Sequence, residues 1–162
     1  MNRNRKKAAV DTCLFLELFL EERTRFAHGV ADLLENPEFE LHVPTIVGVE
    51  AITSVSMRQG AERPPIKNAA IDAAKKFFRE LNCIYIELDK RAMETAQELG
   101  VQYAIKPPDA AVLACAIEAE CDYLFTKDDK LIKRVRGIKN IRVCHPPEPR
   151  GKQLSLDDRF HE

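Results

Sequence analysis

Three carboxylates in this sequence each stand alone inside an apolar run, and a fourth follows a predicted strand. The sequences around them are AAVDTCLFL at Asp11, VPTIVGVEAITSVSM at Glu50, PPDAAVLACAI at Asp109 and YLFTKD ending at Asp128. Burying an unpaired carboxylate costs on the order of several kcal/mol, so these acids call for a compensating partner. Hard divalent cations such as Mg²⁺ are bound by carboxylate oxygens and often share them with a substrate phosphate. The four acids therefore predict a metal site suited to a phosphate substrate.

Composition predicts a single globular domain in the cytoplasm. The chain has 162 residues, of which 45% are apolar and 31% are charged, which is ordinary for a folded domain. The five cysteines are odd in number and show no CxxC or Cys/His spacing, which disfavours both a disulfide framework and a zinc site. The basic start MNRNRKK is followed by an apolar stretch that Asp11 and Glu17 interrupt, so we expect neither a signal peptide nor a membrane span.

Basic residues gather in two stretches although the formal net charge is only −1. The first stretch comprises Lys127, Lys130, Lys133, Arg134, Arg136, Lys139 and Arg142, and the second Arg58, Arg63, Lys67, Lys75, Lys76 and Arg79. Such runs are usually solvated helix faces, and they point to nucleic acid only if they flank the acids.

Strand and helix patterns alternate along the chain. Short apolar or alternating runs predict strands at 8–10, 40–43, 83–87, 123–126 and 140–143. Helical spacing, capping residues and prolines predict helices at 12–22, 25–34, 44–58, 64–81, 89–100, 107–120 and 128–135. We expect a folded domain over 8–143, followed at 144–162 by a polar, proline-rich C-terminal tail outside the core.

This alternation predicts an α/β fold with a parallel sheet and helices on both faces. In such sheets, functional sites gather at the carboxyl ends of the strands. Asp11 and Asp128 follow strands, while Glu50 and Asp109 lie in helices that return to the same edge. We therefore expect the four acids to converge, although they are far apart in sequence.

The order and contexts of these acids resemble those of a known family. The segments VDT at 10–12, PPDAAVLACA at 107–116 and LFTKDDKL at 124–131, together with the lone Glu50, are similar to the successive acidic motifs of PIN-domain ribonucleases. The resemblance is closest to the VapC-type toxins of toxin–antitoxin pairs, and it covers 8–143. Cys13 departs from the pattern, because the family often has Asn or Ser there. Asp129 offers a second choice for the fourth acid, which we align with Asp128.

The resemblance implies an α/β/α sandwich of three layers with a mostly parallel sheet, and an endoribonuclease that depends on Mg²⁺ or Mn²⁺. Metal binding would fall to Asp11 and Asp109 as principal ligands, to Glu50 as a ligand or water-orienting group, and to Asp128 as the ligand of a second ion. Thr12, Thr126 or Asp129 would orient a carboxylate or a water molecule.

The resemblance also implies partners. The expected substrate is single-stranded or looped RNA, whose exposed backbone can reach a shallow acidic cleft. VapC-like proteins commonly form homodimers and are held inactive by a small antitoxin protein, for which the first two predicted helices offer a contact surface. No membrane partner is implied.

Simpler explanations stay open for each acid and for the whole protein. Asp11 and Asp128 could merely cap helices, Asp109 could favour a helix dipole, and Glu50 could lie on a solvated face. A catalytically silent PIN-like module that binds RNA or protein is the alternative function, and a phosphohydrolase of small esters is a third. The chain has no GxGxxG, P-loop or GxSxG motif, which disfavours dinucleotide, P-loop nucleotide and serine-hydrolase chemistry.

Overall fold

A parallel sheet forms the centre of the computed structural model, which describes residues 4–20, 24–59 and 62–150. Within these residues the sheet has five strands in the order β3-β2-β1-β4-β5, and every neighbouring pair is parallel. The strands are β1 (Lys6–Val10), β2 (Phe39–Pro44), β3 (Ile84–Ile86), β4 (Tyr123–Phe125) and β5 (Arg142–Cys144).

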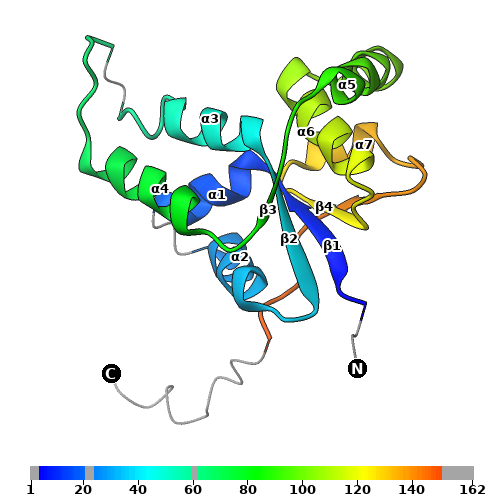
Figure 1. The fold of residues 1–162 in the computed structure, drawn as a ribbon, viewed down its shortest axis with the longest axis horizontal. Coiled ribbons are helices and arrows are strands. Elements are labelled where there is room, and N and C mark those ends of the chain that lie inside the picture. Colours follow the sequence, from blue (N-terminus) through cyan, green and yellow to red (C-terminus); the bar gives the residue numbers. More distant parts are fainter. Residues whose placement is uncertain (1–3, 21–23, 60–61, 151–162) are drawn as a thin grey trace.

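Helices cover both faces of this sheet (Figure 1). One layer holds α1 (Thr12–Phe19), α2 (Arg25–Glu35), α3 (Thr45–Thr53) and α4 (Ala69–Glu80). The other holds α5 (Lys90–Tyr103), α6 (Pro107–Glu118) and α7 (Asp129–Arg134). The arrangement confirms the predicted three-layer α/β/α sandwich with a parallel sheet.

The core lies where the central strands meet α1 and α6. Ala8, Ala9 and Val10 of β1 are fully buried, as expected for a parallel strand covered on both faces. In α6, the small and apolar residues from Ala110 to Ala116 are all buried, so this helix packs tightly into the molecule directly after Asp109. The core thus fixes two of the predicted acids. Asp11 directly follows the buried strand β1, and Asp109 directly precedes the buried part of α6.

The order in which strands are added to the sheet reverses at β1, which lies between β2 and β4. The chain runs from β1 outward to β2 and β3, then returns to place β4 on the other side of β1. In open parallel sheets such a switch point leaves a crevice at the carboxyl ends of the two strands, where ligands bind. Asp11 and Thr126 flank this point, since Val10 pairs with Phe125.

Two predicted helix boundaries on the α1–α4 side are wrong. The helix predicted to reach Arg58 ends at Thr53, because Ser54 is extended and its hydroxyl bonds the backbone of Ala51 and Met57 instead. Its predicted stop, Gly60, lies outside the described residues.

The helix predicted to open at Pro64 begins at Ala69 instead. The Asn68 side chain accepts a hydrogen bond from the Ala70 N–H at 2.8 Å, so Asn68 is the cap and the proline pair stays in the preceding loop. On the same side of the sheet, α1 ends at Phe19, and the predicted end of that helix at Glu22 lies outside the described residues.

The predicted end of α5 at Gly100 is also wrong, because the helix continues to Tyr103. A single glycine inside a helix costs only about 1 kcal/mol relative to alanine, which the packing of α5 against α6 offsets. The helix ends where Ala104 adopts a left-handed backbone with φ +52°.

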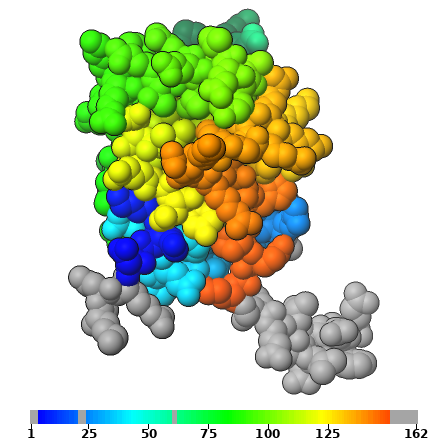
Figure 2. Space-filling model, turned by 90° about the vertical axis from the view of Figure 1, so that its right-hand side faces the viewer, coloured from blue at the N-terminus to red at the C-terminus, as the bar shows by residue number. Residues whose placement is uncertain are grey.

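The segment after β5 lies on the surface against α2, shown in orange-red beside blue in Figure 2. Pro146 and Pro147 approach Gly29, and the Arg150 guanidinium donates to both oxygens of Asp32. Residues 151–162 of the predicted tail lie outside the described part of the chain. No helix in the described part is both long enough and apolar enough to cross a membrane.

Candidate active site

Asp11 is held by two neighbouring strands at the switch point. Its backbone N–H donates to the Phe125 carbonyl at 3.0 Å, which extends the β1–β4 pairing by one residue. The carboxylate is only 6% exposed. One oxygen, Oδ1, accepts from the Thr12 N–H at 2.8 Å, and Oδ2 accepts from the Thr126 hydroxyl at 2.7 Å. Asp11 is therefore oriented from both sides.

Thr126 links Asp11 to the loop that carries Asp128. Its side chain is fully buried, and its hydroxyl oxygen accepts from the Asp128 N–H at 3.1 Å while donating to Asp11. One hydroxyl thus sets the position of two predicted acids, which come from adjacent strands. This agrees with the predicted orienting role of Thr126, and that role stays a prediction.

Cys13 completes this network as a neutral donor. Its Sγ lies 3.5 Å from Asp11 Oδ2 and 3.4 Å from the Thr126 hydroxyl, and it accepts from the Lys127 N–H at 3.5 Å. Burial and the charge of Asp11 raise the pKa of the Cys13 thiol to about 12, so it stays protonated at neutral pH. Cys13 therefore supplies a polar hydrogen to Asp11 and is not a thiolate nucleophile. Sequence reasoning had seen only its departure from the family pattern.

Glu50 reaches the same edge from α3. Its Oε1 accepts from the Thr12 hydroxyl at 3.2 Å, so Thr12 orients both Asp11, through its N–H, and Glu50, through its hydroxyl. Burial raises the pKa of the Glu50 carboxyl, and the charges of Asp11 and Asp109 raise it further. Glu50 is therefore turned toward the other acids and not toward a solvated face.

Asp109 lies in the first turn of α6, just after Pro107 and Pro108. Burial raises the pKa of its carboxyl, the charges of Asp11 and Asp128 add to the rise, and the ammonium of Lys106 opposes it. For Asp11, burial also raises the pKa, the three hydrogen bonds oppose this, and the charge of Asp128 adds to the rise. The structure thus brings Asp11, Glu50, Asp109 and Asp128 into one electrostatically coupled group, which we call the acid cluster.

Asp128 and Asp129 point to different partners. Asp128 caps α7, with its Oδ1 accepting from the N–H groups of Lys130 at 2.9 Å and Leu131 at 3.1 Å, and its charge acts on Asp11 and Asp109. The Asp129 side chain is 72% exposed, and its Oδ1 lies 2.9 Å from His145 Nε2. This geometry favours Asp128 as the fourth acid.

A buried ion pair beside the cluster was not singled out from the sequence. Glu17 is only 4% exposed, and its carboxylate contacts the Lys127 ammonium and accepts from the Thr24 hydroxyl at 2.8 Å. Lys127 lies between Thr126 and Asp128, so this pair anchors the loop after β4 to α1. The only sequence signal was an acid inside the apolar face of the first helix.

The acid cluster suits a hard divalent ion by its chemistry. Its donors are carboxylate oxygens, which Mg²⁺ and Mn²⁺ prefer, and positive charge would relieve the mutual repulsion that raises the pKa of three of them. Within residues 4–20, 24–59 and 62–150, no three or more His, Cys, Asp or Glu side chains are already arranged to hold an ion in common. The metal-binding role of the acids stays a prediction.

Replacing Asp11 by asparagine is expected to stabilise the protein at neutral pH in EDTA. Because the folded-state pKa of Asp11 is raised, the favourable contribution of the protonated acid is complete below its unfolded pKa of about 3.9 and is lost as pH rises through the folded value. Asparagine keeps the shape without the charge. Urea unfolding should show a gain of about 1 kcal/mol at pH 7.5 and little difference at pH 3.5.

An exposed acid provides the control for this measurement. Asp72→Asn on α4 should change the unfolding free energy by less than about 0.5 kcal/mol at either pH. A loss of stability in Asp11→Asn at pH 7.5 would mean that the buried charge of Asp11 does not destabilise the folded protein.

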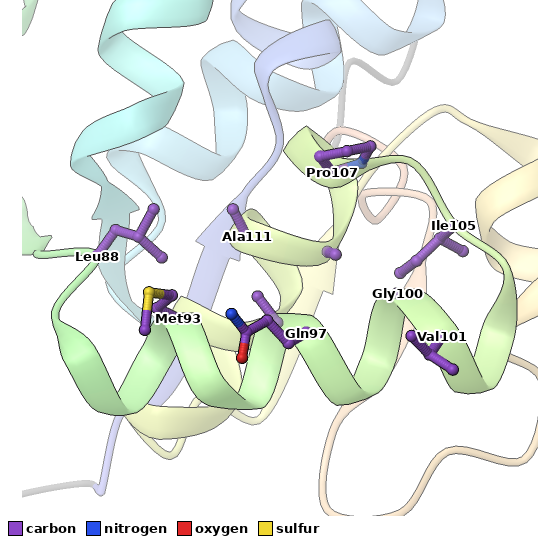
Figure 3. Close-up of a pocket in the computed structure, with 10 residues that line it drawn as sticks. Leu88, Met93, Gln97, Gly100, Val101, Ile105, Pro107 and Ala111 are labelled. Carbon is purple, nitrogen blue, oxygen red and sulfur yellow. The ribbon is translucent and has the colours of Figure 1, made fainter.

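An apolar hollow of about 360 Å³ lies between α5 and α6, and none of the four acids lines it (Figure 3). Its described lining includes Leu88, Met93, Val101 and Ile105 and contains no ionisable side chain. This hollow therefore cannot supply acid, base or metal chemistry. Of the acid cluster, Asp128 borders a different, open groove of about 520 Å³, which we call the lysine groove. It is lined by Cys13, Lys106, Lys127, Asp128, Asp129 and Lys130.

Solved structures of similar fold come from toxin–antitoxin systems. VapBC2 from Rickettsia felis bound to a DNA fragment from its promoter matches with a TM-score of 0.61 and 17% identity, over 85% of this chain and 96% of that one. VapC20 of Mycobacterium tuberculosis, a toxin that cleaves the sarcin-ricin loop, gives 0.62 and 17%, over 83% and 98%. A toxin–antitoxin complex from Klebsiella pneumoniae gives 0.61 and 21%, over 87% and 98%.

At such low sequence identity, these structural matches establish a shared fold and nothing more specific. No curated protein matches the sequence. A family model does match, and it covers most of the chain: residues 8–138 match the PIN domain, a span that includes all four members of the acid cluster. The chain belongs to the PIN-domain family.

Proposed function

We propose that this protein is a Mg²⁺- or Mn²⁺-dependent endoribonuclease and the toxin of a toxin–antitoxin pair. The observation that carries the proposal is the acid cluster at the switch point of a PIN-domain sheet, where the Thr126 hydroxyl bonds both Asp11 and the Asp128 N–H and the charge of Asp128, 117 positions away in sequence, raises the pKa of Asp11. A purely structural role for these acids would not require them to gather against their mutual repulsion.

The chain's own residues would prepare this site before any substrate arrives. Thr126, Thr12 and Cys13 fix the plane of the Asp11 carboxylate through three hydrogen bonds. The Thr12 hydroxyl turns Glu50 toward Asp11. Supporting contacts of this kind keep ligating carboxylates in place, and their removal typically lowers metal affinity or activity by about 10- to 100-fold.

Asp11 and Asp109 would be the principal ligands of a divalent ion, with Glu50 and Asp128 completing the set. The chemistry that such an ion supplies when bound is activation of the attacking water and neutralisation of charge on the phosphodiester. Burial and the charge of Asp11 raise the pKa of Cys13 to about 12, which disfavours a thiolate, and hydrolysis by a metal-activated water would need no protein nucleophile. Single-stranded or looped RNA is the proposed substrate, because the open groove beside the acids admits an exposed backbone.

A cleavage assay on total cellular RNA tests this function. The purified protein is incubated with RNA in Mg²⁺, Mn²⁺ or EDTA, and the new 5′ ends are sequenced. We expect cuts at a few defined positions in either metal and none in EDTA. Absence of cleavage by folded protein free of antitoxin would instead favour a silent binding module, and cleavage of small phosphate esters in place of RNA would favour a phosphohydrolase.

An antitoxin would bind the α1–α4 side in this proposal. A hollow of about 420 Å³ lies there, lined by Leu18, Phe19, Ala70, Ala73, Ala74 and Phe77. An apolar groove of this kind accepts the apolar face of an amphipathic helix. The fold is shared with solved toxin–antitoxin complexes, which supports a protein partner of this class. A nuclease acting on cellular RNA would work in the cytoplasm, where its five free cysteines stay reduced.

A homodimer would form through α5 in this proposal. Val101 is 86% exposed, and Met93 and Leu88 are 43% and 39% exposed around the apolar hollow. Large apolar side chains gathered on a surface usually mark an interface.

Charges placed on this face are expected to separate the dimer. We expect Met93→Glu with Val101→Glu to weaken association about thirtyfold or more, because both charges would be buried on dimerisation. Light scattering after gel filtration measures the change. Gln102→Glu, exposed on the same helix, should leave the mass unchanged. A monomeric wild-type protein would exclude the dimer.

A further inference from the structure

The lysine groove adjoins the acid cluster and opens onto the surface. Asp128 belongs to both, and Cys13, which lines the groove, lies 3.5 Å from Asp11 Oδ2. Two of its lining residues are Lys106, directly before α6, and Lys130, in the first turn of α7. An RNA strand with one phosphodiester at the acids would therefore carry an adjacent phosphodiester into this groove.

Most charges in the groove already have partners. The Lys127 ammonium contacts the buried Glu17, and Asp129 lies against His145. Asp128 accepts two backbone hydrogen bonds at the start of α7. Lys106 and Lys130 differ from these, because both are exposed and, within the described residues, neither forms an ion pair. The Lys106 ammonium also acts on the Asp109 carboxyl, but both lysine side chains are exposed and can contact a ligand.

Several backbone positions beside the groove have no N–H free for an anion. The helix α6 starts with Pro107 and Pro108, which have no N–H to offer an anion. At α7, the N–H groups of Lys130 and Leu131 are bonded to Asp128. Side-chain ammonium groups are therefore the clearest ligands for an anion in this groove, and lysine is a common ligand of phosphate.

We propose that Lys106 and Lys130 form a binding site for the RNA backbone phosphate next to the one that is cleaved. This inference rests on the proposed ribonuclease function. The six side chains that line the groove include no aromatic ring for a base to stack on, so the site reads the backbone and not the base.

Steady-state cleavage of a short RNA containing a mapped cut site tests this site in Mn²⁺. Each ammonium near a phosphate contributes about fivefold to affinity, so Lys106→Ala with Lys130→Ala should raise KM about 25-fold, with the smaller effect on kcat. The slope of log KM against log salt concentration should fall by about 1.4, because each of the two lost contacts to a single strand contributes about 0.7. Lys133→Ala, exposed on the same helix but outside the groove, should keep the wild-type KM within about twofold.

Neutral methylphosphonate linkages, introduced one at a time beside the cut, identify the phosphate. In wild-type protein one adjacent linkage should raise KM about 25-fold, and in the double variant the same linkage should have no further effect. A double variant that behaves like Lys133→Ala, or a linkage penalty that persists in full in the double variant, would overturn the phosphate site while leaving the ribonuclease intact. Absence of cleavage by wild-type protein would instead remove the proposed function itself.

Discussion

Replacing Asp109 by asparagine is expected to reduce RNA cleavage by about a thousandfold in Mn²⁺. Asparagine keeps the shape of the side chain and its place in the first turn of α6, so the buried helix behind it should stay intact. In the proposed mechanism it removes one of the carboxylates that would hold a divalent ion, and that ion would offset the charge that develops on the phosphodiester. Losses of this kind commonly reach about two to three orders of magnitude. Single-turnover cleavage of an RNA with a mapped cut site measures the change.

Metal binding gives a readout of Asp109 that does not depend on activity. A ligand that binds only the folded state stabilises it by about 2.7 kcal/mol at a hundred times its Kd. Mn²⁺ should therefore raise the Tm of wild-type protein, and at the same concentration it should raise the Tm of Asp109→Asn much less. The two results together separate a lost ion from a lost fold.

Asp122→Asn is the matched control for this experiment. Asp122 also lies beside β4, but at the opposite end of the strand, where its carboxylate accepts from the Lys7 N–H at 2.8 Å. We expect its cleavage rate to stay within about twofold of wild type. Cleavage by Asp109→Asn at more than a tenth of the wild-type rate would contradict the role given to the acid cluster.

The acids could be predicted from the sequence because a lone carboxylate in an apolar run signals the free-energy cost of burying its charge. Asp11, Glu50 and Asp109 stand alone in apolar runs, and the alternation of strands and helices assigns them to one edge of a parallel sheet. The strand order could not be read in the same way. That β1 and β4 are neighbours depends on pairings such as Val10 with Phe125, which join residues more than a hundred positions apart.

The supporting contacts were hidden for the same reason. Cys13 bonds Thr126 and the Lys127 N–H, and Glu17 meets Lys127, all across the β1–β4 boundary. The sequence marked Cys13 as a departure from the family pattern and Glu17 as an acid in an apolar helix face, but neither signal indicates the partner across the sheet. The choice between Asp128 and Asp129 likewise depends on the cap of α7, because adjacent acids look alike in sequence but point to different partners.

The errors at the end of α3 and the start of α4 arose where a polar side chain bonds nearby backbone groups in competition with the helix, which residue patterns do not reveal. The Ser54 hydroxyl bonds the backbone of Ala51 and Met57 where α3 ends, and Asn68 caps α4 after a proline pair that itself resembles a helix start. These errors leave the site untouched, since the acid cluster depends on strand ends, on the first turn of α6 and on the part of α3 that carries Glu50 before the helix ends. The parts of the fold that position the chemistry were therefore the more predictable parts.

Thr126→Val is expected to lower cleavage by about 10- to 100-fold through the position of Asp11. Valine fills the same buried volume but removes the hydroxyl that donates to Asp11 Oδ2 and accepts from the Asp128 N–H. Both acids then lose the contact that joins β1 to the loop after β4, and losses of this size are typical when a group behind a metal ligand is removed. The Mn²⁺ concentration that gives half the maximal rate should rise accordingly.

Destabilisation is the competing explanation, because an unpaired buried polar group costs about 1–3 kcal/mol. Thr126→Ser distinguishes the two, since it restores the hydroxyl and loses only a methyl group, and it should recover cleavage to within about threefold of wild type. A positioning role also requires that high Mn²⁺ partly rescue Thr126→Val, which a global loss of fold would not allow. If Thr126→Ser cleaves as poorly as Thr126→Val, packing and not the hydroxyl controls the site, and the link between Thr126 and Asp11 has no catalytic consequence.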